Sequence, residues 1–141
     1  MFEWWKDVFR PLRIEDPDFG QMRFLRQTST WECQAHFPPI DGPVEVLIEG
    51  DSTGPTASQR ETWQGLASHY ARLADEARAL IQKAVEAQQV DGFEFHLAAI
   101  SLPRDSASRY ELELTFGNRL GPPQFDVRVA SWRVQGVLGP L

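Results

Sequence analysis

The chain has 141 residues, of which 42% are apolar, and its 20 acidic and 14 basic side chains give a formal net charge of −6. This length predicts one globular domain over residues 1–141. The acidic excess argues against nucleic-acid binding, because a protein that holds phosphates needs a basic face, and no stretch approaches the roughly 20 apolar residues of a membrane-spanning helix.

The first ten residues predict a short helix over 1–10 with Phe2, Trp5 and Phe9 on one side and Trp4 near the edge of that side. So short a helix is marginal alone and needs a surface to pack on. Its aromatic side either docks on the domain or anchors a partner, so Trp4 and Trp5 are candidate partner-binding residues. The segment has no uninterrupted apolar core of the length that a signal peptide needs. We therefore expect a cytoplasmic protein that does not bind membranes.

Three strands are expected before residue 50. Residues 22–26 form a probable short strand, and residues 31–37 and 44–49 alternate apolar with polar side chains, which is typical of a half-buried strand. Ile14 leads into residues 16–20, where two aspartates, a proline and a glycine indicate a turn.

A long amphipathic helix is predicted over residues 58–88, where apolar side chains recur at steps of three and four. Ser58 and Glu61 match the Ser-x-x-Glu capping box, and Asp91-Gly92 is the expected stop. At 1.5 Å per residue the helix is roughly 45 Å long, against about 20–27 Å for a strand, so it must overhang the sheet, bend or fray. Its expected core residues are Trp63, Leu66, Tyr70, Leu73, Leu80 and Ile81.

The second half predicts three or four more strands, over residues 93–102, 110–116, 125–129 and 132–137. Strands joined by short loops pair as antiparallel neighbours. The predicted fold is α+β, an antiparallel β-sheet of about six or seven strands in the order β-β-β-α-β-β-β, packed on the one long central amphipathic helix. Whether the strands form one sheet or two stays open.

The residues that usually carry chemistry form no recognisable motif. Cys33 is the sole cysteine, so an intrachain disulfide and a multi-cysteine zinc site are excluded. It falls on the core side of its strand, which favours a buried structural thiol over a nucleophile. His36, His69 and His96 are far apart in sequence, and we expect no metal and no cofactor.

Acidic residues outside the helix are the candidates for partner binding. Residues 41–51 contain four acidic side chains and no basic one, and two more glutamates share one face of a later strand. Paired carboxylates could serve acid–base chemistry if one were desolvated, but on an exposed strand face they more often solubilise or protect an edge. The candidate set is Asp41, Glu45, Glu49, Asp51, Glu111 and Glu113.

Several of these patterns together resemble a known group of domains. They are the turn Asp16-Pro17-Asp18-Phe19-Gly20, a strand after it, Trp31 in the next strand, residues 44–48 and a helix that starts with Ser and Gln. This combination resembles small uncharacterised bacterial domains that carry a DPxFG-type turn and are associated with polymorphic-toxin loci as candidate immunity proteins. The likeness covers roughly residues 14–137. The resemblance implies no catalytic residues.

Three hypotheses for function follow. The first is a non-catalytic binding protein, of the immunity type, that binds a basic effector through acidic strand surfaces. The second is a small hydrolase-like enzyme with an unrecognised site of histidines and carboxylates. The third is an accessory domain that self-associates through Trp4 and Trp5. Whether the protein is a monomer or a homodimer is left open.

Overall fold

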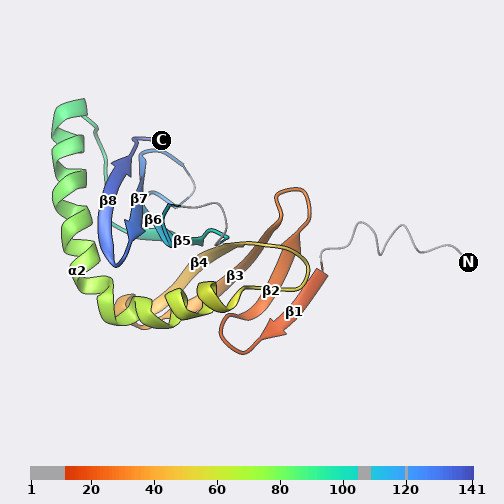
Figure 1. The fold of residues 1–141 in the computed structure, drawn as a ribbon. Coiled ribbons are helices and arrows are strands. Elements are labelled where there is room, and N and C mark those ends of the chain that lie inside the picture. Colours follow the sequence, from red (N-terminus) through yellow and green to blue (C-terminus); the bar gives the residue numbers. More distant parts are fainter. Residues whose placement is uncertain (1–11, 105–108, 120) are drawn as a thin grey trace, which may run out of the picture.

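The computed structural model describes residues 12–104, 109–119 and 121–141 (Figure 1). The helix predicted over residues 1–10, with Trp4 and Trp5, lies outside these residues. The described elements are β1 (Leu12–Asp16), β2 (Gly20–Leu25), β3 (Thr30–Phe37), the short 3-10 helix η1 (Pro38–Ile40), β4 (Gly42–Glu49), α2 (Ala57–Gln88), β5 (Leu97–Leu102), β6 (Leu112–Gly117), β7 (Gln124–Ala130) and β8 (Arg133–Leu138).

The described strands form one eight-stranded sheet whose order in space follows the order in the chain. Neighbouring strands pair antiparallel except β4 and β5, which pair parallel from Glu45↔Ala99 to Ile48↔Leu102. Antiparallel strands can be joined by tight turns, whereas a parallel pair needs a long crossover, and α2 is that crossover. The sheet is therefore two four-stranded meanders joined side by side, which answers the question of one sheet or two.

The prediction of six or seven strands in the order β-β-β-α-β-β-β was wrong in its count and in its order, since four strands precede α2 and four follow it. Four strands precede the helix, because residues 12–16 form the edge strand β1 and pair with β2 from Leu12↔Phe24 to Asp16↔Gly20. Its inward positions end on an acidic residue, Asp16, which interrupts the apolar alternation of a half-buried strand. The strand predicted over 93–102 begins only at Leu97.

Among the described elements, α2 covers one face of the sheet and none covers the other (Figure 1). Burial alternates along β3 and β4. In β3, the buried residues are Trp31, Cys33, Ala35 and Phe37, and the residues between them are not buried. The helix contributes its own buried residues to the same core: Leu66, Tyr70, Leu73, Ala74, Ala77 and Ile81. The predicted α+β packing of a sheet on one amphipathic helix is confirmed.

Two predicted core residues of the helix are placed differently by the structure. Leu80 is 38% exposed, whereas Leu73 is completely buried. The buried positions 70, 73, 77 and 81 form one stripe, and Leu80 lies beside it. Trp63 is half-buried and packs on Phe19 and Phe37 at ring-centroid distances of 5.4 and 5.9 Å.

The ends of α2 also differ from the prediction. Thr56 is the N-cap: its hydroxyl accepts from the Gln59 N–H at 3.1 Å, and the Gln59 side-chain oxygen accepts from the Thr56 N–H at 2.9 Å. The capping box is thus Thr56–Gln59 and not Ser58–Glu61. At the other end Gln89, in a left-handed conformation, is the C-cap, ahead of Asp91-Gly92.

The excess length of α2 is taken up by a bend. At 1.5 Å per residue the helix is about 48 Å long, and Figure 1 shows its first part lying across β3 and β4 and its later part turning to run alongside β8. The helix thus follows the twist of the sheet from one meander to the other. Within the described residues, no helix has the length and apolar character needed to cross a membrane.

Candidate functional site

The DPxFG turn of residues 16–20 is a structural device that is closed by Asp16. One carboxylate oxygen of Asp16 accepts hydrogen bonds from the backbone N–H groups of Asp18, at 2.8 Å, and Phe19, at 3.1 Å. Phe19 then enters the core, where it is 2% exposed, and Gly20 has a φ of +75°, which glycine adopts without steric cost. Asp16, Phe19 and Gly20 of the motif therefore each have a folding role.

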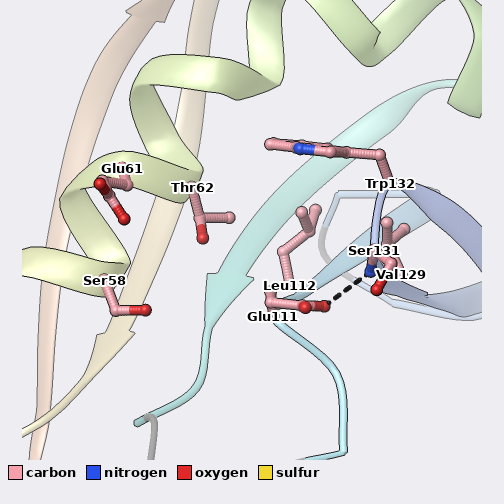
Figure 2. Close-up of a pocket in the computed structure, with 8 residues that line it drawn as sticks. All are labelled: Ser58, Glu61, Thr62, Glu111, Leu112, Val129, Ser131 and Trp132. Atoms are coloured by element: carbon pink, nitrogen blue, oxygen red, sulfur yellow. Dashed lines mark hydrogen bonds between the residues drawn. The ribbon is translucent and has the colours of Figure 1, made fainter.

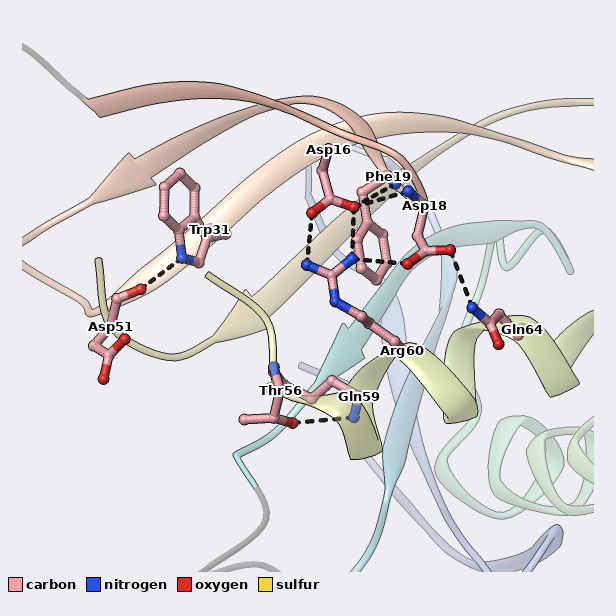
Figure 3. Close-up of polar contacts among 9 residues, drawn as sticks. All are labelled: Asp16, Asp18, Phe19, Trp31, Asp51, Thr56, Gln59, Arg60 and Gln64. Atoms are coloured by element: carbon pink, nitrogen blue, oxygen red, sulfur yellow. Dashed lines mark hydrogen bonds and ion pairs between the residues drawn. The ribbon is translucent and has the colours of Figure 1, made fainter. Parts of the chain in front are cut away.

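Arg60 of α2 binds both aspartates of this turn (Figure 3). Its Nη1 donates to Asp16 Oδ1 at 2.8 Å and to Asp18 Oδ2 at 2.7 Å, and its Nη2 donates to Asp16 Oδ2 at 2.7 Å. Gln64 adds a bond to Asp18 at 3.1 Å. Hydrogen bonding from Arg60, reinforced by the backbone donors, lowers the pKa of Asp16 although burial opposes this. Arg60 balances one of the two carboxylate charges and holds both carboxylates against α2, so the cluster is a fold contact.

Gln59 fastens the start of α2 to the junction between the two meanders. It is 2% exposed, and its Nε2 donates to the carbonyl oxygens of Glu49 at 2.7 Å, Leu102 at 3.0 Å and Pro103 at 3.1 Å. These carbonyls lie at the ends of β4 and β5, the parallel pair. The side chain therefore donates hydrogen bonds to carbonyl oxygens at the strand ends, where the backbone pairing between strands stops.

Asp51, one of the candidate partner-binding residues, is engaged in the loop that follows β4. Its carboxylate accepts from the Thr53 side chain, from the Thr53 N–H at 2.9 Å and from Arg104 at 2.7 Å. These hydrogen bonds, the Thr53 hydroxyl first, lower the pKa of Asp51 to about 2. Its carbonyl accepts from the Trp31 indole N–H at 2.8 Å (Figure 3).

The remaining candidate acids do not form one surface. Asp41 lies in the turn between η1 and β4, and Glu111 precedes β6 and accepts from the Ser131 N–H at 3.1 Å. Glu45, Glu49 and Glu113 occupy strand positions that alternate with buried ones, so they point to the side of the sheet opposite α2. We call this side the outer face.

A row of side chains in register crosses the outer face from β2 to β7. It runs Arg23, Glu32, Leu47, Ser101, Glu113, Arg128. Ion pairs close both ends of the row: Arg23 with Glu32, and Arg128 with Glu113 at 3.2 Å. Between them the row consists of the uncharged side chains of Leu47 and Ser101.

The centre of the outer face is acidic. The four central strands, β3 to β6, contain Glu32, Glu45, Glu49 and Glu113 and no lysine or arginine. Among the described residues, the ion pairs of these glutamates involve only Glu32 and Glu113. A surface pressed against this centre therefore meets two ion-paired carboxylates, Glu32 and Glu113, and two, Glu45 and Glu49, that form no ion pair within the described part of the chain.

Glu113 is a partly buried carboxylate with a second carboxylate, Asp126, nearby. Burial raises its pKa, and the charge of Asp126 raises it further, while Arg128 acts in the opposite direction. Asp126 lies diagonally across from Glu113 on β7 and accepts from the Thr115 hydroxyl at 2.7 Å. A cation brought close to Glu113 and Asp126 would relieve this repulsion.

The outer face is hollowed at one end. A depression of about 730 Å³ lies over β1 to β3 and is lined by the polar side chains of Arg13, Glu15, Gln21, Arg23, Glu32 and Gln34.

Sequence reasoning missed four residues of the outer face: Glu32, Asp126 and the two arginines of the row, Arg23 and Arg128. Their signal was present, since each occupies a polar position of an alternating strand.

The three histidines lie in separate surroundings. His36 is exposed on β3, His96 is exposed just before β5, and the ring of His69 stacks on Trp132 with centroids 4.2 Å apart. In the described part of the chain, no group of three His, Cys, Asp or Glu side chains could hold a metal ion. Cys33 is buried, and burial raises the pKa of its thiol to about 12, which agrees with a structural thiol.

Comparisons with protein-family models, with curated proteins and with solved structures found no match for this chain. What the site does must therefore be argued from its own geometry.

Proposed function

We propose that this protein is a non-catalytic binding domain that docks a basic protein partner on the outer face of its sheet. The observation that carries the proposal is the acidic centre of that face, where three of the four neighbouring strands β3 to β6 contain glutamates and none of the four contains a lysine or arginine. The likeness of residues 14–137 to DPxFG-type immunity domains supports a basic effector as the partner.

The form of the outer face supports docking of a folded surface. The row that crosses it has the uncharged Leu47 and Ser101 in the middle and ion pairs at both ends, and Glu45 and Glu49 lie on β4 on either side of Leu47. Interfaces commonly combine less polar positions with polar ones around them. Charge complementarity there would speed association and fix orientation more than it adds affinity, so binding should weaken steeply as salt rises.

The test is association with the protein encoded beside this one in the genome. Titration calorimetry at two salt concentrations should give a complex that weakens at the higher one. Glu45→Lys should weaken it by at least about tenfold, which is roughly 1.4 kcal/mol. Asp75→Lys is the matched control, because Asp75 is exposed on α2 and the substitution makes the same change in net charge.

Failure of the proposal has a defined form. A neighbour that does not associate, or a complex weakened equally by Glu45→Lys and Asp75→Lys, would refute docking on the outer face.

The affinity of the complex should also increase as the pH rises from below 4.5. The pKa of Glu113 is raised, and this carboxyl must lose its proton before it attracts a cation.

A further inference from the structure

A second concave site lies away from the outer face, between α2 and the turn that joins β7 to β8 (Figure 2). Its volume is about 260 Å³. Ser58 and Thr62 of α2 line one side, and the buried side chains of Leu112 and Val129 form its apolar floor. Drug-sized ligands usually occupy roughly 300–1,000 Å³, so this hollow fits one side-chain-sized group.

Trp132 forms the roof of the hollow. In Figure 2 its indole is seen edge-on, with α2 on one side of the ring plane and Leu112 and Glu111 on the other. His69 of α2 stacks on the ring with planes only 9° apart. One face of the indole is therefore covered by the helix, and the opposite face is turned toward the hollow.

The position of Trp132 is held at a conformational cost. Ser131 and Trp132 form the two-residue turn between Ala130 and Arg133, with φ values of 50° and 58°. Such turns favour asparagine and glycine, and positive φ in a bulky residue is uncommon. The ring is kept in place by Gly65, His69 and a hydrogen bond from Arg72 to the Trp132 carbonyl.

Two carboxylates share the hollow with this aromatic face. Glu61 lines it from α2 and Glu111 from the start of β6. Among the described residues, the hydrogen bond that Glu111 accepts is the one from the Ser131 N–H to Oε2, so Oε1 can accept from a ligand. The hydroxyls of Ser58, Thr62 and Ser131 complete the polar lining, and the lining residues that the structure describes include no lysine or arginine.

The neighbouring hollow, of about 220 Å³, shares Ser58, Thr62 and Glu111 with the first and is also lined by Arg109. Among the described lining residues, Arg109 lines the second hollow and not the first, and Arg72 approaches the first hollow only through its hydrogen bond to the Trp132 carbonyl. The charge character therefore changes along the groove, acidic beneath Trp132 and mixed beside Arg109.

We propose that the hollow beneath Trp132 binds an organic cation, a guanidinium or alkylammonium group, between the indole face and the carboxylates of Glu61 and Glu111. An aromatic face attracts a cation through its quadrupole, and carboxylates supply charge-assisted acceptors for its N–H donors. The small volume and the apolar floor select a cation carried on a short alkyl chain. This site is independent of docking on the outer face.

The test uses the full chain and a matched pair of probes. N-acetyl-arginine methylamide carries the cation without free termini, and N-acetyl-citrulline methylamide is its neutral counterpart. Titration followed by NMR should shift the Trp132 indole signal, assigned with Trp132→Phe, for the arginine probe alone. Equal shifts with the citrulline probe would overturn the proposal, as would the absence of any shift at millimolar probe.

Variants locate the site. Glu61→Gln and Glu111→Gln should each weaken binding of the arginine probe by about two- to fivefold. Glu86→Gln is the control, because Glu86 is an exposed glutamate of the same helix that accepts from Gln82. The affinity of the Glu86→Gln protein for the arginine probe should equal that of the wild type. If Glu86→Gln weakens binding as much as Glu61→Gln, the attraction is that of net charge and the proposed site is wrong.

The natural source of the cation is decided by two further probes. Binding of agmatine without binding of a capped Gly-Arg-Gly peptide assigns the hollow to a small free amine. Binding of the peptide at the same Trp132 signal assigns it to a protein side chain. Both outcomes support the same chemistry, and failure of both probes overturns it whether or not a partner docks on the outer face.

Discussion

The ring of Trp132 occupies the space where a side chain at residue 65 would stand. A Cβ added to Gly65 would lie 2.8 Å from Cζ2 of Trp132, closer than real contacts allow. Glycine inside a helix costs about 1 kcal/mol relative to alanine, so the helix gives up local stability at this position to let the β7–β8 turn approach it.

Gly65→Ala should therefore destabilise the protein although it improves helix propensity. Overpacking typically costs about 1–3 kcal/mol, which offsets the gain of about 1 kcal/mol from propensity, and we expect a net loss of about 1 kcal/mol in urea unfolding. In a Trp132→Ala background the same substitution should be stabilising. An unchanged sign in the two backgrounds would contradict the contact between residues 65 and 132.

Asp16→Asn should weaken the fold at neutral pH by about 2 kcal/mol, because it removes the charge that Arg60 binds. Since the folded state lowers the pKa of Asp16, the unfolded chain takes up the proton first, and this stabilisation is lost as the pH falls below about 3.9. Unfolding free energies of the two proteins should converge in that range. Glu15→Gln, at an exposed position of β1, should show no such convergence.

Gln59→Leu tests the attachment of α2 to the junction of the meanders. It would leave the carbonyls of Glu49, Leu102 and Pro103 without their side-chain donor. A buried acceptor left unpaired costs about 1–3 kcal/mol, so the urea midpoint should fall clearly. Gln82→Leu, an exposed substitution on the same helix, should leave the midpoint nearly unchanged. Equal midpoints for the two variants would show that Gln59 is dispensable.

Leu73→Asp and Leu80→Asp form a matched pair on α2. Leu73 is fully buried, so a carboxylate there should unfold or severely loosen the domain. Leu80 is 38% exposed, and the same change should cost only the helix propensity difference of about 0.5 kcal/mol. Thermal unfolding followed by circular dichroism distinguishes them. A Leu73→Asp protein that melts like the wild type would contradict the packing of α2.

Sequence patterns correctly predicted the strands and the helix whose burial pattern depends on residues close together in the chain. The alternation in β3, β4, β6 and β7 and the three-and-four spacing in α2 report burial on one side, and each is confirmed. The acidic residues of the outer face were partly identified in the same way, through Glu45, Glu49 and Glu113.

The errors arose where a distant residue decides the local structure. β1 was missed because its inward Asp16 is balanced by Arg60, which comes from a helix far along the chain. The capping box was placed two residues late because Thr56–Gln59 and Ser58–Glu61 both match the motif, and the choice between them depends on carbonyls at the ends of β4 and β5. The hollow beneath Trp132 joins residues from α2, β6 and the β7–β8 turn, so no local pattern indicates it.

The parallel pairing of β4 with β5 also constrains how the chain reaches its native state. Within the described strands, the other pairings join sequence neighbours and can form by local closure. The parallel pair must close the whole segment 50–96, which costs about 2 kcal/mol more in chain entropy than a tight turn. We expect this closure to come late in folding, so that substitutions at the β4–β5 pair change the unfolding rate more than substitutions within either meander.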